Sequence, residues 1–269
     1  MSRDIRVNQI SMVFQGRGEP VIALDKVDLH VEAGHFASII GPSGCGKSTL
    51  LRLIAGLMKP FAGAVTLGGE SPSAARRDRG LGFVFQSPTL LPWRTARQNV
   101  ELPQDIRGHT DRRADSDHAS ALIELVGLKG FENSLPHELS GGMQQRAAIA
   151  RALVLKPDVL MLDEPFGALD EITRQRMNLE LLRIWAESGT TALLVTHSIA
   201  EAVFMSDRVY VMSPRPGRIT SVVDVDLPRP RSLDDMRTPA FFDYVNRVRD
   251  GLFGRSSSPA LERPYRVEA

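Results

Sequence analysis

Apolar and polar residues alternate along two stretches near the start of the chain, 5–14 and 21–31. This period of two predicts a pair of β-strands joined by a turn at 15–20. Shorter apolar runs predict further strands at 35–40, 80–86, 158–165, 191–197 and 208–213. The run at 158–165 is continuous, as in a strand buried within a parallel sheet, and an edge hairpin is expected through 217–225.

Apolar residues at helical spacing occur between these strands. They follow a glycine-rich loop within 41–57 and recur at 171–187, so strands and helices alternate along the chain. That alternation predicts an α/β fold with a parallel sheet. Residues 87–155 interrupt it, first with proline and tryptophan and then with charged helix-forming residues, which predicts an inserted helical subdomain.

The C-terminal part has a helical pattern of its own. Four apolar residues recur at helical spacing there: Phe241, Val245, Val248 and Leu252. This pattern favours a terminal helix packed on its own domain. We therefore expect one domain at 5–225, with its helical subdomain at about 87–155, and a helical extension at 226–254. Residues 255–269 have little apolar content and are expected to form a disordered tail.

Composition excludes several classes of partner and location. The 269 residues include 33 Lys and Arg against 32 Asp and Glu, a formal net charge of +1. This balance gives no general attraction to nucleic acid, so no nucleic-acid partner is expected. Cys45 is the only cysteine, which rules out an intrachain disulfide and fits a reducing compartment. With no signal-peptide core and no apolar run of roughly 18 residues, we expect a cytoplasmic protein that meets a membrane only through a partner.

The stretch GPSGCGKST matches a phosphate-binding loop between a strand and a helix. Its predicted nucleotide-binding residues are Gly41, Pro42, Ser43, Gly44, Cys45, Gly46, Lys47, Ser48 and Thr49. Glycines let backbone N–H groups approach phosphate oxygens, and the helix N-terminus adds its positive dipole end. Lys47 is placed to reach the β- and γ-phosphates, and the Ser48 hydroxyl to bind Mg²⁺. Cys45 is interpreted as a spacer, and the alternative for the whole stretch is an ordinary glycine-rich turn.

Acidic residues follow a second predicted strand. Asp163 and Glu164 come directly after the run VLML. Two carboxylates beside phosphates are costly without a cation, so Mg²⁺ held by Asp163 is implied, with Glu164 placed to polarise an attacking water. Without the phosphate loop, the same pair would fit a helix cap at a strand end.

Two further polar residues end predicted strands, where ligands collect in open α/β sheets. His197 follows the run ALLVT, and Gln86 follows GFVF. We expect His197 to contact a γ-phosphate, although a lone histidine is often a satisfied core residue. Gln86 is a weaker candidate for orienting water or the metal.

A serine and two glycines raise a separate question. Ser140, Gly141 and Gly142 precede a strongly helical run, with no lysine beside them. A capping serine followed by bare backbone amides favours an anion. Because the chain already has a phosphate-binding loop far upstream, these residues alone do not indicate which anion the second helix start would bind.

Taken together, the motifs GPSGCGKST, LSGGMQQR, VLMLDEP and GALD, with Gln86 and His197, resemble those of ABC-type ATPases in order and approximate spacing over about 5–225. The resemblance implies a P-loop NTPase fold, an ABC ATPase domain with a RecA-like core, an antiparallel β subdomain and an inserted helical subdomain. It also implies a head-to-tail dimer in which the Ser140 helix start of one chain binds the γ-phosphate of ATP held by the other chain.

The resemblance assigns further roles. It implies a catalytic set comprising Glu164, His197, Gln86 and Lys47, with Mg²⁺ ligands among Ser48, Gln86 and Asp163. Phe14 would stack on adenine where tyrosine is usual, although strand-end packing is the alternative. Asp170 would communicate across the dimer. Met143 stands where glutamine is commonest, and no loss of activity is expected because the serine and glycines contact the phosphate.

The segment after Gln86 bears on the partner. Leu90, Leu91, Trp93 and Arg94 are compatible with subdomain core or with a groove that grips a helix of a membrane permease. The stretch LLPWRT resembles importers of nitrate, sulfonate, taurine and related solutes. The resemblance therefore implies an importer ATPase peripheral on the inner face of the membrane, working with a permease and indirectly with a solute-binding protein. A non-transport ABC ATPase of the cell-division, cluster-assembly or repair type is the alternative.

Overall fold

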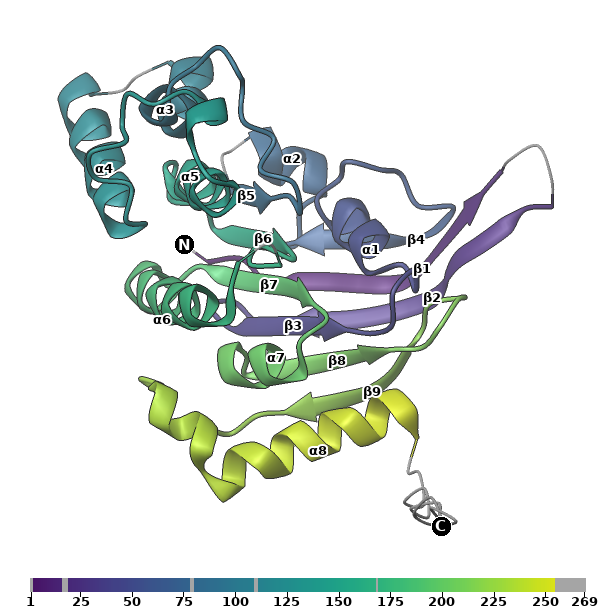
Figure 1. Cartoon of the computed structure of the whole chain (residues 1–269). Coiled ribbons are helices and arrows are strands. Elements are labelled where there is room, and N and C mark those ends of the chain that lie inside the picture. Colours follow the sequence, from purple (N-terminus) through teal and green to yellow (C-terminus); the bar gives the residue numbers. More distant parts are fainter. Residues whose placement is uncertain (1, 16–18, 78–79, 109–110, 168, 255–269) are drawn as a thin grey trace, which may run out of the picture.

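The computed structural model of the protein describes residues 2–15, 19–77, 80–108, 111–167 and 169–254. Within these residues, two β-sheets form the framework (Figure 1). The smaller sheet is antiparallel and contains, in spatial order, β2 (Val21–Val31), β1 (Ile5–Phe14) and β4 (Ala62–Leu67). The two strands predicted from alternation are confirmed. The strand β4 was not predicted, because its first three residues are exposed and it lacks a period-two pattern.

The larger sheet places several predicted site residues just after the C-terminal ends of its parallel strands. Its spatial order is β5 (Leu81–Val84), β6 (Val159–Asp163), β7 (Thr191–Thr196), β3 (Phe36–Ile40), β8 (Arg208–Met212) and β9 (Ile219–Asp224). All neighbouring pairs are parallel except β8 and β9, which form the predicted hairpin. Every residue of β3, β6 and β7 is buried, as expected where helices cover both faces. The strand β5 is shorter than predicted, so Gln86 lies two residues beyond its end and is exposed.

Connecting helices have identifiable start and stop signals. Helix α1 (Lys47–Ile54) follows β3, α6 (Glu171–Ser188) follows β6, and α7 (Ile199–Met205) follows β7. The Asp170 carboxylate accepts a hydrogen bond from the backbone N–H of Thr173 at 3.0 Å and so caps the start of α6. Gly189, with φ of 63°, is the C-cap that follows its last residue. A short helix, α2 (Pro72–Arg77), lies between β4 and β5.

Among the described residues, three α-helices lie between β5 and β6 in the chain and pack on one another at one end of the molecule (Figure 1). They are α3 (Ala96–Arg107), α4 (Arg112–Leu125) and α5 (Gly141–Leu153). Each begins with a side-chain cap, from Thr95, Asp111 and Ser140 respectively. Helix formation in this interval was predicted, while 87–155 as subdomain bounds and 5–225 as domain bounds remain predictions.

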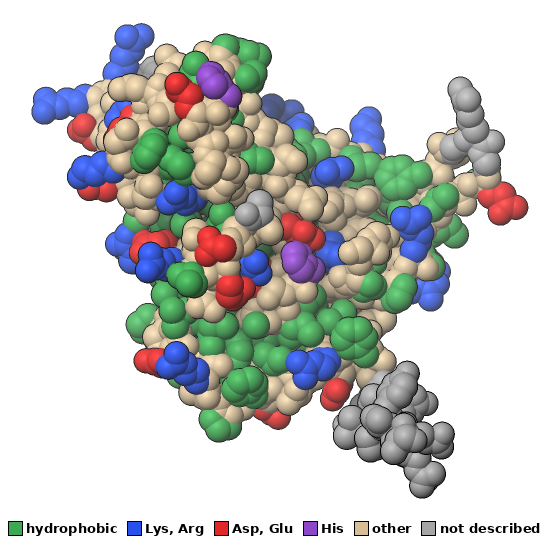
Figure 2. Space-filling view, in the orientation of Figure 1, with side chains coloured by type: hydrophobic (Ala, Val, Ile, Leu, Met, Phe, Trp, Pro, Cys, Tyr) green, Lys and Arg blue, Asp and Glu red, His purple; other side chains and the backbone are tan. Residues whose placement is uncertain are grey.

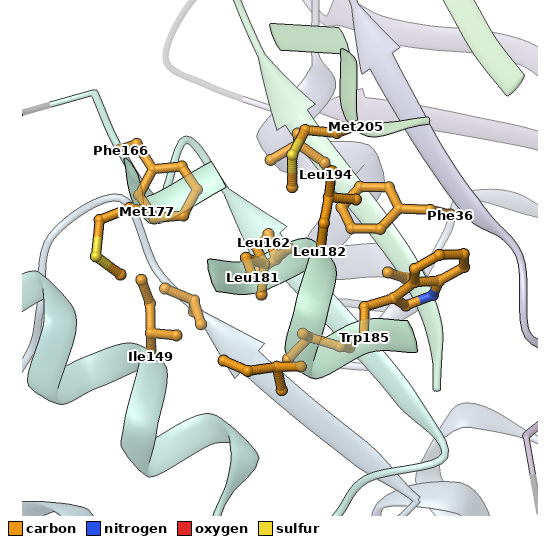
Figure 3. Close-up of a cluster of buried hydrophobic side chains, with 14 of the residues drawn as sticks. Phe36, Ile149, Leu162, Phe166, Met177, Leu181, Leu182, Trp185, Leu194 and Met205 are labelled. Atoms are coloured by element: carbon orange, nitrogen blue, oxygen red, sulfur yellow. The ribbon is translucent and has the colours of Figure 1, made fainter. Parts of the chain in front are cut away.

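The core lies on both faces of the larger sheet, because successive residues of a strand point to opposite sides. Phe36 and Ile40 of β3 belong to one buried cluster, and Ala37 and Ile39 belong to the other. Figure 3 shows part of the cluster that contains Phe36, here called the first core cluster; the other is the second core cluster. The rings of Phe36 and Trp185 pack edge to face, with their centroids 5.7 Å apart. Burying an aromatic or branched side chain stabilises the fold by about 1.5–3 kcal/mol.

The C-terminal helix α8 (Pro239–Phe253) packs on α7, β8 and β9 through the predicted apolar face. Phe241, Val245 and Val248 are buried. The buried Arg231 guanidinium ties the preceding segment to the end of α7 through the carbonyl oxygens of Val203, Phe204 and Ser206, and burial lowers its pKa to about 10. The tail expected at 255–269 lies outside the described residues.

Within the described ranges, none of the helices combines the length and the apolar character required to cross a bilayer.

Candidate functional site

A cleft of about 780 Å³ opens where the parallel strands end. Its lining comes from β1, β2, the loop after β3, the start of α1, the residues following β5, β6 and β7, and the turn after β8. The lining residues are Phe14, Val21, Ala23, Ser43, Gly44, Gly46, Lys47, Ser48, Thr49, Gln86, Glu164, His197 and Arg215. Residues far apart in sequence meet here because parallel strands bring their carboxyl ends to one edge of the sheet.

The glycine-rich loop between β3 and α1 requires its glycines. Gly44 and Gly46 have φ of 74° and 107°, a region that favours glycine. A Cβ on Gly46 would also lie 2.7 Å from Leu24 Cδ2. Helix α1 has no side-chain N-cap. Its first backbone N–H groups are therefore left without a side-chain acceptor, as in an anion site.

The Lys47 ammonium is held inside this loop. The side chain is only 7% exposed, and Nζ donates to Gly41 O at 2.8 Å and to Pro42 O at 3.1 Å. Gly41, Pro42 and Cys45 do not line the cleft, and Cys45 packs in the second core cluster. The buried thiol fits the interpretation of Cys45 as a spacer. Of the predicted loop residues, the cleft brings together Ser43, Gly44, Gly46, Lys47, Ser48 and Thr49.

Oxygen donors suited to a divalent cation meet beside the loop. Ser48 Oγ donates to Asp163 Oδ1 at 2.8 Å, and Asp163 is only 1% exposed. Burial raises the pKa of Asp163, and the hydrogen bond from Ser48 opposes that rise. A nearby cation would favour the charged carboxylate.

These two oxygen ligands fit a Mg²⁺ ion that also binds the substrate, and do not fit a metal ion held by protein ligands alone. Among the described residues, no cluster of three or more His, Cys, Asp or Glu side chains is arranged to hold a metal ion. Mg²⁺ usually binds through one or two protein oxygens together with substrate phosphates and water. Ser48 and Asp163, beside a phosphate loop, match that requirement.

Glu164 is the centre of a polar group at the end of β6. Its φ of 47° is unusual for a residue other than glycine, and its backbone N–H donates to Val195 O at 2.9 Å. Its Oε2 lies 3.4 Å from His197 Nδ1 and accepts from Gln86 Nε2 at 3.3 Å. Strained backbone held by neighbouring structure is typical of functional positions. The exposed His197 imidazole lines the cleft, so it is not a satisfied core residue.

The predicted second anion site lies outside this cleft. Ser140 caps α5 by accepting from the N–H of Met143 at 3.3 Å, and neither Ser140 nor the two glycines line the cleft. A Cβ on Gly141 would meet nothing within 4 Å, whereas one on Gly142 would lie 2.7 Å from Leu169 Cδ2. One chain therefore does not bring the two predicted phosphate-binding helix starts together.

Three lining residues were not predicted: Val21, Ala23 and Arg215. Val21 and Ala23 belong to a strand whose alternation indicates only burial. Arg215 comes from the turn after β8, and its Nη2 donates to Gly44 O at 3.2 Å across 171 residues of sequence. No local signal marks it, because its position depends on β8 lying beside β3.

The segment after Gln86 divides between core and surface. Leu90 packs against the first core cluster, whereas Trp93 is 71% exposed. The Arg94 guanidinium donates a hydrogen bond of 2.6 Å to the Asp105 carboxylate. The core alternative therefore holds for Leu90 but not for Trp93.

A second cavity, of about 990 Å³, lies between α4 and the C-terminal half of α6. Its lining includes none of the predicted site residues. The candidate site is therefore the smaller cleft, which several predicted site residues line, and not the larger cavity.

Comparisons with known proteins agree on one family. A family profile described as ABC transporter matches residues 24–167. The chain is 44% identical to an uncharacterized ABC transporter ATP-binding protein of Methanocaldococcus jannaschii, over 92% of this chain and 91% of that protein. It is 42% identical to the nitrate import ATP-binding protein NrtD of Synechocystis sp., over 94% and 96% respectively. It is 43% identical to an aliphatic sulfonates import ATP-binding protein, SsuB, of Bacillus cereus, over 85% and 88%.

A solved structure gives the same result for the fold. The ATP-binding cassette MJ0796, in a dimeric post-hydrolysis state bound to ADP and phosphate, superposes with a TM-score of 0.75. It is 33% identical in sequence, and the match covers 83% of this chain and 100% of that one.

Proposed function

Because the chain belongs to the ABC transporter family, we propose that it is the ATP-hydrolysing subunit of an importer and energises uptake through a separate membrane permease. The observation that carries this proposal is the meeting of Lys47, Ser48 and Glu164 in one cleft. The family and the solved ADP complex support ATP as the substrate.

ATP would bind with its phosphates on the amides at the start of α1. Lys47 would exchange its carbonyl partners, Gly41 O and Pro42 O, for the β- and γ-phosphate oxygens. Phe14, at 40% exposure, offers a ring face for adenine at one side of the cleft. Ser48 and Asp163 would hold Mg²⁺, which when bound would neutralise charge on the phosphates.

Glu164 is the proposed general base for attack of water on the γ-phosphate. Its carboxylate faces the cleft between Gln86 and His197, which orient it from two sides. His197 would contact the γ-phosphate, and Gln86 would help to orient water or the metal. A positioned base typically contributes about 10²–10⁴-fold to the rate.

A second copy would complete the site. The related cassette MJ0796 is dimeric, which supports a dimer here. In the proposed head-to-tail arrangement, the Ser140 helix start faces the γ-phosphate bound by the other chain, and Asp170 at the start of α6 takes part in communication across the dimer. The exposure of Gly141 and Asp170 leaves both available for such a contact.

The solute class follows from the relatives. Proteins named for import of nitrate and of aliphatic sulfonates are 42–43% identical to this chain over most of its length. We propose a small solute of the nitrate, sulfonate and taurine class, a permease partner that binds at the exposed Trp93 and, indirectly, a solute-binding protein. The chain would then lie on the inner face of the membrane through its permease.

The non-transport alternative is less well supported. The two relatives above whose names state a role, NrtD and SsuB, are named for import. On the face shown in Figure 2, basic and acidic side chains are interspersed, without the single-sign field that a nucleic-acid partner would require.

Two measurements test the proposal. The purified chain should release phosphate from ATP only with Mg²⁺ present. Expressed with the permease from its own genome, it should co-purify with that permease, and its deletion should lower cellular uptake of nitrate or of a sulfonate such as taurine. Co-purification with division or cluster-assembly proteins instead, with uptake unchanged, would favour the alternative.

A further inference from the structure

We propose that Arg215 is a nucleotide-binding residue, whose guanidinium reaches the phosphate chain of ATP from the turn between β8 and β9. This inference rests on the proposed ATPase function and adds a residue outside every motif recognised in the sequence. Arg215 lines the same cleft as Lys47 but comes from the C-terminal part of the chain.

The guanidinium lies directly on the phosphate loop. Nη2 of Arg215 donates to Gly44 O at 3.2 Å, and a Cβ on Gly44 would lie 3.8 Å from the same nitrogen. Arg215 is also part of the cleft lining, together with Ser43 and Lys47. The side chain therefore lies against the loop and faces the cleft in which ATP is proposed to bind.

The turn that carries Arg215 is fixed at its base. Gly217 exchanges backbone hydrogen bonds with β2, donating to Ala23 O at 2.9 Å and accepting from Asp25 N at 3.1 Å. Ser213 Oγ closes the turn by donating to Pro216 O at 2.9 Å. The backbone is so close to the phosphate loop that a Cβ on Gly217 would lie 2.2 Å from the carbonyl oxygen of Cys45.

The side chain itself is held much less firmly than its backbone. Arg215 is exposed, and the hydrogen bond found for its guanidinium is the one to a neutral carbonyl, Gly44 O. Charge-assisted bonds to phosphate are roughly twice as strong as bonds between neutral groups. A phosphate oxygen arriving in the cleft would therefore replace Gly44 O as the partner of the guanidinium.

Charge in the cleft supports this exchange. Of the residues that line it, Lys47 and Arg215 are the basic side chains of fixed charge, and Glu164 is the acid. The Lys47 ammonium is buried and shared between two carbonyls. A triphosphate carries several negative charges, and a planar guanidinium suits two phosphate oxygens at once. Arg215 supplies the second positive charge.

A structural alternative makes a different prediction for conservative variants. If Arg215 only clamped the loop through Gly44 O, a neutral donor would suffice, and Arg215→Gln would behave like the unsubstituted chain. If its charge binds phosphate, Arg215→Lys retains most of the function and Arg215→Gln does not. Arg218→Ala is the matched control, because Arg218 lies in the same turn, is exposed, and pairs with Asp25 outside the cleft.

The experiment is equilibrium binding of ATP and of AMP to the purified full chain and these variants, at low and high salt. We expect Arg215→Ala and Arg215→Gln to weaken ATP binding by about tenfold, as for loss of one partly exposed charge-assisted bond. The loss should be smaller for AMP, and it should shrink at high salt because exposed charges are screened. Melting temperatures equal to that of the unsubstituted chain would show that folding is retained.

Two results would overturn the inference: ATP binding by Arg215→Gln equal to that of the unsubstituted chain, or an equal loss in Arg218→Ala. Either leaves the ATPase function intact. A failure of the unsubstituted chain to bind ATP would instead contradict the proposed function, and this inference with it.

Discussion

Ser48 Oγ donates a hydrogen bond of 2.8 Å to Asp163 Oδ1, although 115 residues separate the two in the chain. One stands at the start of α1 and the other at the end of β6. The bond joins the phosphate loop to the acidic strand end. The proposed Mg²⁺ site depends on this contact, because it places a hydroxyl and a carboxylate side by side.

We expect Asp163→Asn to remove the Mg²⁺ dependence of ATP binding. The amide is close in size to the carboxylate but carries no charge to attract a divalent cation. Without Mg²⁺, the variant and the unsubstituted chain should bind ATP with similar affinity. With Mg²⁺, only the unsubstituted chain should gain affinity and hydrolyse ATP. An equal gain in both, measured by titration calorimetry, would contradict the assignment of Asp163.

Glu164→Gln should lower the rate of ATP hydrolysis by about 10²–10⁴-fold, because the amide cannot accept a proton from water. ATP and Mg²⁺ should still bind. ATP would then accumulate between two chains, and a sizing column should report a dimer with ATP and a monomer with ADP. Turnover within a few-fold of the unsubstituted rate would assign the base elsewhere.

Adding Ser140→Arg to Glu164→Gln should abolish that ATP-dependent dimer. A long cationic side chain would replace the hydroxyl at the start of α5, where the other chain's γ-phosphate is expected. ATP binding to the same chain should persist, because Ser140 does not line its own cleft. If the double variant dimerised as well as Glu164→Gln alone, Ser140 would be only a helix cap.

Gly217→Ala and Gly141→Ala form a pair with opposite expected results. A Cβ on Gly217 would lie 2.2 Å from Cys45 O, so the phosphate loop must shift and ATP binding by the isolated chain should weaken by tenfold or more. A Cβ on Gly141 meets nothing within 4 Å of its own chain, so binding should be unchanged. Binding by both variants is measured on the monomer, and an unchanged affinity in Gly217→Ala would show that the turn does not support the loop.

Glu201→Gln should raise the melting temperature at neutral pH. Burial raises the pKa of Glu201, the hydrogen bond from the Thr196 hydroxyl opposes the rise, and among the described residues Glu201 Oε1 is buried without a hydrogen-bond partner. A raised pKa means that the folded state binds the proton more tightly, so ionisation of the carboxylate destabilises the fold progressively as pH rises above the ordinary pKa, and in full above the folded pKa.

The gain from Glu201→Gln should therefore shrink as pH falls through that folded pKa and vanish below the ordinary value of 4.5. Thermal scans of both proteins from acid to neutral pH measure this. A constant difference across the range would mean that shape, and not charge, explains the change.

Trp93→Ala should leave folding and ATP binding intact and weaken assembly with the permease. The indole is 71% exposed, so truncation removes little buried area within the chain. Ile106→Ala is the control, since Ile106 is 78% exposed on α3. Co-purification with the permease should fall for Trp93→Ala and not for Ile106→Ala, whereas an unfolded Trp93→Ala would favour a packing role.

Local patterns were enough to predict much of the fold and part of the site. Burial of one face or of both faces of an element leaves a direct pattern of apolar residues in the sequence. This pattern is the period-two alternation of β1 and β2, the apolar runs of β3, β6 and β7, and the apolar face of α8. The strand β4, exposed over its first half, left no such record. For Trp93, the same sequence allowed both core and surface, and only the packed structure separates it from Leu90.

The sequence by itself determined that a glycine loop precedes a helix, that carboxylates follow a buried strand, and that a serine caps another helix, because these depend on neighbours in the chain. Only the tertiary structure decided that Ser48 bonds Asp163, that Glu164 lies between Gln86 and His197, and that Arg215 reaches Gly44. The physical reason is the order of strands in the sheet. Hydrogen bonding places β8 beside β3 and β6 beside β7, and no local pattern of side chains encodes which strands become neighbours.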